Sequence, residues 1–262
     1  MNEHSHQHDH HDHTHDAHRL QAWIKTAILL GLGAYFAYNI LSGNLANYIN
    51  NRFAWLSVVA AGLFLLLGLM SALDLLRHSS HSHDQHEHHD HAHEHGLSWP
   101  ILGVVAIPLL LGVLVPSRPL GASAIDGNYN ANAAVEGSDF ASFGSDPLTW
   151  NVLNWLRAIN YSEDLGEFSG QQADVIGFIY RNDQFPADHF MVMRFVISCC
   201  VADATPVGLP FYWQAPVSLP NDTWVRVVGT FELGEFGGNV APILQAESVE
   251  FIDEPEHPYL YP

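Results

Sequence analysis

Hydrophobic and polar positions along this chain follow two different patterns, and the change falls near residue 117. Before that point, long apolar runs alternate with polar tracts. Three runs, at residues 20–45, 53–76 and 97–116, are long enough to cross a bilayer, because about 20 helical residues span roughly 30 Å. The pattern predicts a multi-pass α-helical membrane anchor with three transmembrane helices.

Residues 146–262 have the pattern of a soluble domain. Apolar residues at helical spacing in residues 146–160 predict one amphipathic helix. The strand-like segments that follow alternate apolar with polar residues and are rich in Val, Ile, Phe, Tyr and Trp; they are ADVIGFIYR, HFMVMRFVISCC, LPFYWQAPV, TWVRVVGTFEL and APILQAESVEFI. One helix and about five short strands favour a mainly-β domain, an OB-like barrel with one preceding helix; a small sandwich is the rival. Residues 117–145 are small and polar and predict a linker.

Two polar tracts, at residues 1–19 and 77–96, hold 17 of the 19 histidines and interleave them with Asp and Glu. Segments of such low hydrophobicity cannot bury themselves, so we expect a disordered tail and a disordered loop. The histidines are His4, His6, His8, His10, His11, His13, His15, His18, His78, His81, His83, His86, His88, His89, His91, His93 and His95.

These histidines predict metal binding. Neutral imidazole is a good ligand for Zn²⁺ and for other divalent transition metals, and carboxylates add oxygen ligands. A flexible tract offers many exchangeable positions, which suits capture, buffering or sensing better than catalysis. Two alternatives are a solvated low-complexity linker and a histidine-based pH sensor.

The charge balance and the composition of the apolar runs narrow the function. A formal charge of −19, with 28 acidic residues against nine Lys and Arg, argues against nucleic acid as a partner. The three runs carry no Asp, Glu, His or Arg near their centres, whereas ion pathways normally place such residues within spanning helices. The chain is therefore expected to act beside a separate pathway-forming protein. No nucleophile elbow, phosphate loop or HExxH pattern occurs, so we do not expect an enzyme.

Cys199 and Cys200 are the chain's two cysteines, and they are adjacent. If they continued the preceding strand, one would point inward and the other outward. Three interpretations are open: incidental small residues, a thiolate metal site with Asp203, with or without His189, or a redox pair. A disulfide between adjacent cysteines would be strained and labile.

Three crossings place both histidine tracts on one face of the membrane and the C-terminal domain on the other. The Lys and Arg residues that flank the runs favour a cytoplasmic location for the tracts. We therefore expect an integral membrane protein of the plasma membrane, in contact with membrane lipid.

The run RFVISCCVADATPVGLPF, followed by DTWVRVVGTFE and the terminal HPYLYP, is similar to the YcgQ-like family of membrane proteins. GFIYRND and LLLGVLVPSRPLGA also fit, and the resemblance covers the chain from Leu20 onward. It implies a subunit of a two-component permease whose larger membrane partner forms the pathway, and it supplies no catalytic residue. The metal prediction rests on the histidine tracts themselves.

Together, these observations predict a membrane-anchored accessory subunit of a permease that is linked to divalent metal, with zinc as the first choice. Two alternatives stay open: an anchored metal or pH sensor without a transport role, and an enzyme that uses Cys199, Cys200 and Asp203.

Overall fold

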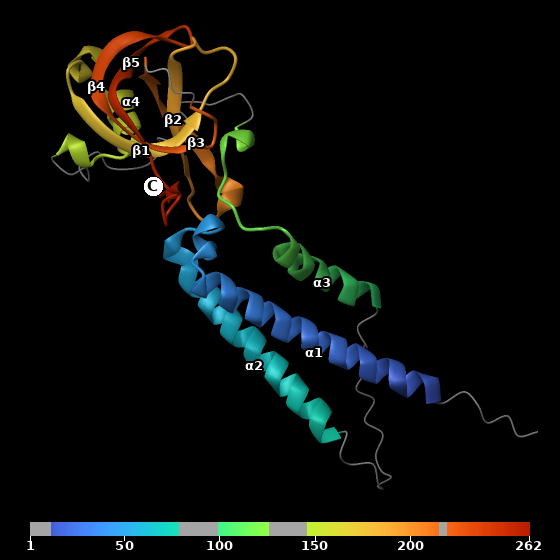
Figure 1. Ribbon diagram of the computed structural model, residues 1–262. Helices are drawn as coiled ribbons and strands as arrows, with labels where there is room; N and C mark the ends of the chain where they lie inside the picture. Colours follow the sequence, from blue (N-terminus) through green and yellow to red (C-terminus); the bar gives the residue numbers. More distant parts are fainter. Residues whose placement is uncertain (1–11, 79–98, 126–145, 215–218) are drawn as a thin grey trace, which may run out of the picture. The chain divides into compact units, whose positions relative to one another are not determined.

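The computed structural model describes residues 12–78, 99–125, 146–214 and 219–262 (Figure 1). The chain divides into two compact units. The first, which we call the helical unit, comprises Met1–Asn44 and Ala54–Ser117. The second, the strand domain, comprises Arg118–Pro262 together with Leu45–Phe53, the short segment between the first two helices.

The helical unit contains α1 (Asp12–Leu41), α2 (Ala54–His78) and α3 (Trp99–Leu114). Two helices are long and apolar enough to cross a membrane, over Arg19–Leu41 and Asn51–Arg77. The third, α3, has 16 residues, which at 1.5 Å per residue gives a length of about 24 Å. It is therefore shorter than the roughly 30 Å of a hydrocarbon core.

Helix α1 begins at Asp12, inside the segment that we assigned to a disordered tail of residues 1–19. Once a helix has formed, each further residue adds a hydrogen bond without the cost of a new nucleus. The apolar helix that follows therefore extends backwards into a polar sequence that contains neither Gly nor Pro.

Helices α1 and α2 approach closely through small residues. A methyl group at Gly68 would lie 2.7 Å from the Leu30 side chain, and one at Gly33 would lie 2.7 Å from Leu65. The Thr26 and Ser71 hydroxyls also form a hydrogen bond of 2.6 Å between the two helices. Small residues and interhelical hydrogen bonds hold helices together where lipid removes the hydrophobic driving force.

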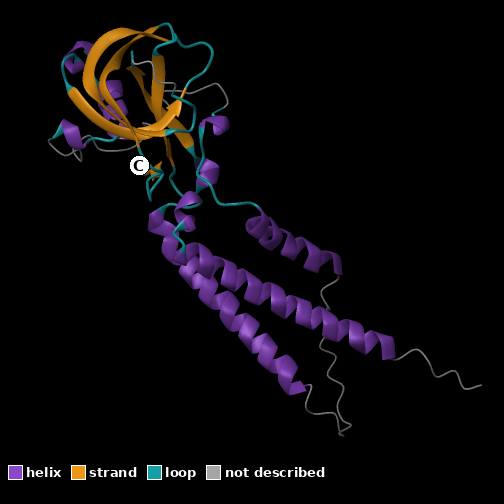
Figure 2. Ribbon diagram, in the orientation of Figure 1, coloured by secondary structure: helices purple, strands orange, loops and turns teal. Residues whose placement is uncertain are grey.

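The strand domain has one six-stranded mixed sheet. Its strands are β1 (Gln172–Tyr180), β2 (His189–Val196), β3 (Thr205–Tyr212), β4 (Trp224–Phe236), β5 (Asn239–Phe251) and β6 (Tyr259–Leu260). The order is β1-β4-β5-β3-β2-β6, and β1 also pairs with β2, so the pairings of the first five strands return to their starting point. The strands are strongly curved (Figure 2).

Most pairs of neighbouring strands are antiparallel; β3–β5 and β2–β6 are parallel. The longest pair, β4 and β5, turns at Gly237 and Gly238, which have φ of 60° and 81°. Positive φ at both central residues is what a two-residue hairpin turn requires, and glycine adopts it without a steric cost.

Helix α4 (Val152–Tyr161) packs on this sheet. The helix that we expected over residues 146–160 starts only at Val152, because the Asn151 side chain accepts a hydrogen bond from the Asn154 N–H at 3.0 Å and caps it there. Trp155 is completely buried and lies 4.9 Å, ring centre to ring centre, from Phe231 on β4. It belongs to the core that joins α4 to the sheet.

Candidate metal centre

The two histidine tracts lie largely outside the described residues, so their metal binding stays a prediction. On the described backbone, His13, His15 and His18 belong to the first turns of α1, and His78 is the last residue of α2. The predicted ligands outside the described residues are His4, His6, His8, His10, His11, His81, His83, His86, His88, His89, His91, His93 and His95.

Cys199 and Cys200 do not lie on β2, contrary to our expectation. The strand ends at Val196, and the chain leaves the sheet through a loop into the 3₁₀ turn Val201–Asp203. Cys199 is exposed and Cys200 is half-buried. The expected alternation of one inward and one outward side chain is therefore wrong, because these backbone N–H groups bond to a side chain and not to a neighbouring strand.

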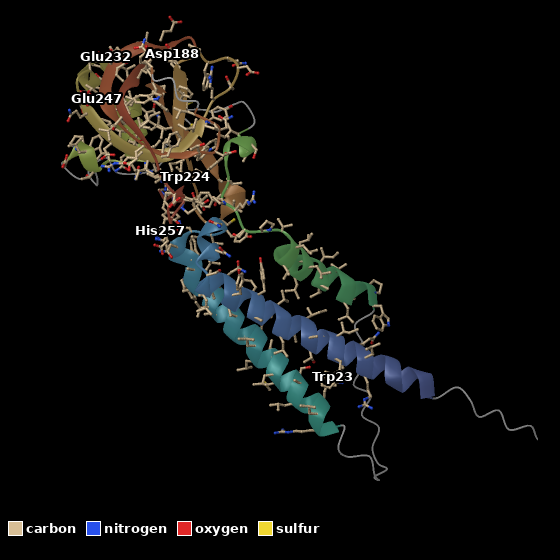
Figure 3. All side chains as sticks on the ribbon, viewed as in Figure 1. Trp23, Asp188, Trp224, Glu232, Glu247 and His257 are labelled. Carbon is tan, nitrogen blue, oxygen red and sulfur yellow. The ribbon has the colours of Figure 1, made fainter. Side chains whose placement is uncertain are left out.

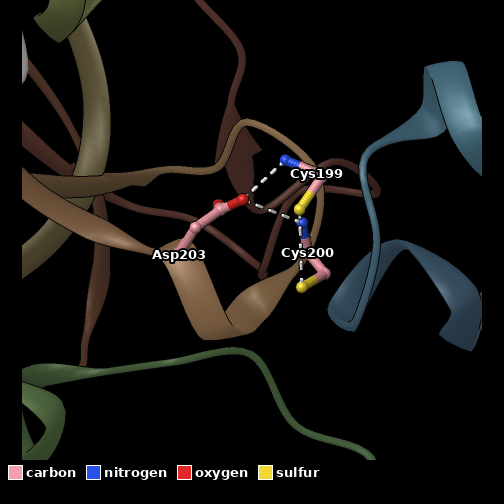
Figure 4. A group of neighbouring side chains, drawn as sticks. All are labelled: Cys199, Cys200 and Asp203. Atoms are coloured by element: carbon pink, nitrogen blue, oxygen red, sulfur yellow. Dashed lines mark hydrogen bonds between the residues drawn. The ribbon is translucent and has the colours of Figure 1, made fainter.

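That side chain is Asp203 (Figure 4). Its carboxylate accepts hydrogen bonds from the backbone N–H groups of Ser198 at 2.8 Å, Cys199 at 2.7 Å and Cys200 at 3.3 Å. Burial opposes ionisation of Asp203, but hydrogen bonds from the Cys199 thiol and from the three N–H groups outweigh it and lower the pKa of the carboxyl to about 2. The ionised carboxylate thus holds the loop in shape.

The two thiols are close enough to share a ligand. Their Sγ atoms lie 3.7 Å apart, and potential ligand atoms of Cys199, Cys200 and Asp203 all lie within 4.8 Å of one another. Hydrogen bonding to Asp203, and then to Cys200, raises the pKa of the Cys199 thiol to about 11. Cys199 is therefore protonated at neutral pH, which makes it a poor nucleophile and means that a metal ion must displace its proton.

His189 does not join this group. It stands at the first residue of β2, whereas the cysteines follow the last, and at about 3.3 Å per residue the eight-residue strand separates them by roughly 20 Å. The His189 Nδ1 atom lies 2.9 Å from the Asp188 carboxylate. Asp188 is at the end of the strand domain away from Trp224 (Figure 3). The possible His189 ligand is therefore excluded.

The segment between α1 and α2 completes the loop. Ile49 forms an antiparallel bridge with Cys200, in which Asn50 N–H donates to the Cys199 carbonyl at 3.0 Å and Val201 N–H donates to the Tyr48 carbonyl at 2.8 Å. The Asn50 side-chain amide donates to the Ser198 carbonyl at 2.8 Å. A segment about 150 residues earlier in the chain therefore supports the cysteines.

Tyr259 on β6 forms hydrogen bonds with the Leu45–Phe53 segment and with the chain after α3. Its hydroxyl donates to the Asn47 carbonyl at 3.2 Å and accepts from the Leu120 N–H at 2.9 Å. It thereby connects the C-terminal strand, the Leu45–Phe53 segment and the chain that follows α3. Sequence reasoning missed these contacts, because no periodicity links three short polar segments so far apart in the chain.

Replacing Asp203 by Asn is expected to lower the free energy of unfolding by about 1–2 kcal/mol at pH 7, because the near-surface carboxylate holds three N–H groups. The pKa near 2 is below the unfolded value of about 3.9. The extra stability that the Asp203 carboxylate gives the wild type is therefore complete above the unfolded-state pKa of about 3.9 and is lost as the pH falls towards 2. Pulse proteolysis in urea, on the full-length protein in detergent at pH 7 and pH 3, measures it.

The matched control is Asp253→Asn, which removes an exposed carboxylate outside this loop. Equal urea midpoints for Asp203→Asn and wild type at pH 7 would contradict the assigned role of the carboxylate.

These features define a class: a chain with two membrane-length helices joined to a C-terminal mixed-sheet domain that carries a pair of adjacent cysteines on a loop. The DUF1980 N-terminal domain matches residues 24–131 and the DUF1980 C-terminal domain matches residues 148–262. The chain belongs to the DUF1980 family, as its resemblance to YcgQ-like proteins predicted.

Two relatives match over nearly their whole lengths. The UPF0703 protein YcgQ of Bacillus subtilis is 24% identical over 277 residues, which cover 89% of this chain and 97% of the relative. A protein of Streptococcus mutans, described as a candidate subunit of a two-component membrane permease complex, is 26% identical over 280 residues, covering 91% of this chain and 98% of the relative.

Proposed function

We propose that this protein is a membrane-anchored accessory subunit of a permease complex and that it handles divalent metal, zinc in the first instance, through its histidine tracts. The observation that carries the proposal is the match to the Streptococcus mutans relative, whose described role is that of a subunit in a two-component complex. Because the match covers nearly the whole length of both chains, it includes the helices as well as the strand domain.

The composition of the helices supports an accessory role. Between Thr26 and Leu73, the helical residues include no Asp, Glu, His, Lys or Arg apart from Arg52 in the connecting segment. An ion path through this chain alone would lack the ligands and proton carriers that such paths use. In our proposal the larger permease partner supplies the path.

Connectivity supports three crossings. Leu45–Phe53, which joins α1 to α2, belongs to the same compact unit as Arg118–Pro262. If α2 carries the chain across the membrane and away from that unit, the stretch containing α3 must carry it back. We therefore infer a third span at residues 97–116, the run expected from the sequence, to which α3 belongs.

On three crossings, we propose that both histidine tracts lie on the membrane face opposite the strand domain. We propose that the tracts are cytoplasmic, in a plasma-membrane protein. The closed pairing of β1 to β5, with α4 packed on the sheet, supports an OB-like barrel. We propose that this barrel docks the partner. We propose no enzymatic role, which agrees with the protonated state of the Cys199 thiol at neutral pH.

The test is co-purification. The tagged full-length protein, crosslinked in its native host and purified in detergent, is expected to carry one multi-spanning membrane permease in constant ratio to itself. A methyl group added at Gly62 on α2 or at Gly103 on α3 would meet no atom within 4 Å, so Gly62→Trp and Gly103→Trp place a bulky side chain at helix positions that this chain leaves open. Loss of the permease from either variant would identify the contacting face.

Gly68→Trp is the matched comparison, since it disrupts the contact of α2 with Leu30 of α1. Recovery of the wild-type protein without any permease, with the crosslinker proven active on a known membrane complex, would reject the accessory-subunit proposal.

A further inference from the structure

We propose that Cys199 and Cys200 form a thiolate site for one divalent thiophilic cation of the zinc class, in the loop that follows β2 of the strand domain. The cluster lies outside the histidine tracts, and binding at this site requires neither the tracts nor a permease partner. Failure of this inference therefore leaves the proposed function standing, and the reverse is also true.

The distance between the sulfurs favours a metal over a disulfide. A tetrahedral ion holds each thiolate sulfur at about 2.3 Å, which places two such sulfurs roughly 3.8 Å apart. The observed Sγ–Sγ distance is 3.7 Å. A disulfide would require about 2.05 Å, so the backbone would have to rearrange to form one.

Asp203 is a positioning residue in this site. Its oxygens are within ligand distance of the sulfurs but already accept the N–H groups of Ser198, Cys199 and Cys200. These bonds turn the two side chains to the same side of the loop. Residues that orient the ligands of a metal matter nearly as much as the ligands, and their loss weakens binding by about 10–100-fold.

The two thiolates supply two of four tetrahedral positions, and the exposure of Cys199 leaves the remaining positions open to solvent or to a further ligand. A structural zinc site is closed by four protein ligands. An open two-thiolate site instead holds an ion that can be released into solvent or transferred to another protein.

Binding is coupled to the segment between α1 and α2. The Cys199 carbonyl accepts from Asn50 N–H, and Val201 N–H donates to Tyr48, so both bonds flank the proposed ligands. An ion that fixes the cysteine loop is expected to slow hydrogen exchange at the Asn50 and Val201 amides. This readout is independent of the metal spectrum.

The experiment titrates Cd²⁺ into full-length reduced protein in detergent and follows the thiolate-to-cadmium charge-transfer band in the ultraviolet. Histidine has no thiolate and cannot contribute to this band. The band therefore reports on Cys199 and Cys200, which are the two cysteines of the chain. A chain that lacks residues 1–18 and has Ser and Gly in place of His78–His95 runs in parallel. Zn²⁺ then competes for the site.

One Cd²⁺ per chain, displaced by Zn²⁺, is expected in both proteins. Cys199→Ser and Cys200→Ser should each remove the band, Asp203→Asn should weaken binding about 10–100-fold, and metal should slow exchange at Asn50 and Val201. Urea midpoints for each variant establish that it is folded. Absence of the band from folded wild type, its survival in a single Ser variant, half an equivalent per chain, or unchanged exchange at both amides overturns the proposal.

Discussion

Replacing His78–His95 by Ser and Gly and removing residues 1–18 is expected to abolish the binding of several equivalents of Zn²⁺ by the purified chain. Calorimetric titration of Zn²⁺, Ni²⁺ and Cu²⁺ into full-length protein in detergent measures the change. The reason is chemical: these segments hold 17 of the 19 histidines, and neutral imidazole is a ligand for all three ions.

The same binding is expected to weaken as the pH falls from about 7.5 to 5.5, because the ordinary pKa of histidine is about 6.5 and the protonated ring has no lone pair for a metal. A matched variant replaces Asp84, Glu87, Asp90 and Glu94 with Ser and keeps every histidine. It should retain most of the equivalents, since carboxylates are secondary ligands here.

Zinc binding that is unchanged in the chain without tract histidines would refute metal capture by the tracts. If the residual binding were then lost in Cys199→Ser, the metal would be assigned to the strand domain alone.

Substituting Trp155 by Ala should lower the free energy of unfolding of the strand domain by about 3–5 kcal/mol, the largest stability effect that we expect in this chain. Trp155 is completely buried, and its ring lies 4.9 Å from Trp150, 4.9 Å from Phe231 and 6.4 Å from Phe168. Removing it leaves a cavity between α4 and the sheet. Pulse proteolysis in urea on the full-length protein measures the loss.

Leu148→Ala is the control, because its side chain is 49% exposed and lies in the turn just before α4. Its effect should stay within about 0.5 kcal/mol. A Trp155→Ala protein that unfolds at the wild-type urea concentration would mean that α4 does not stabilise the sheet.

Local sequence patterns predicted the regular elements of this protein well. The apolar runs around residues 20–45 and 53–76 appear as α1 and α2. Neither run contains proline, and an apolar segment in lipid satisfies its backbone hydrogen bonds by forming a helix. The five alternating segments appear as β1 to β5, since a period of two residues places one face of each strand in the core. The two-residue β6 carries too short a pattern to be recognised.

The ends of the elements were harder to predict. We extended the strand through Cys200, but it stops at Val196 because Asp203 captures the next backbone donors. We likewise expected a helix over residues 97–116, and the helix that the structure describes covers Trp99–Leu114. An element can end at a single local hydrogen bond, which a propensity averaged over many residues does not register.

The sequence by itself determined the membrane-length helices, the mainly-β C-terminal half, the histidine tracts and the family. These depend on composition and on periodicity, which act over neighbouring residues. Only the tertiary structure decided that Asp203 organises the cysteine loop, that Ile49 and Asn50 pair with it, and that Tyr259 ties three segments together. Those contacts join residues far apart in the chain, and their energy appears only when packing brings single donors and acceptors within hydrogen-bond distance.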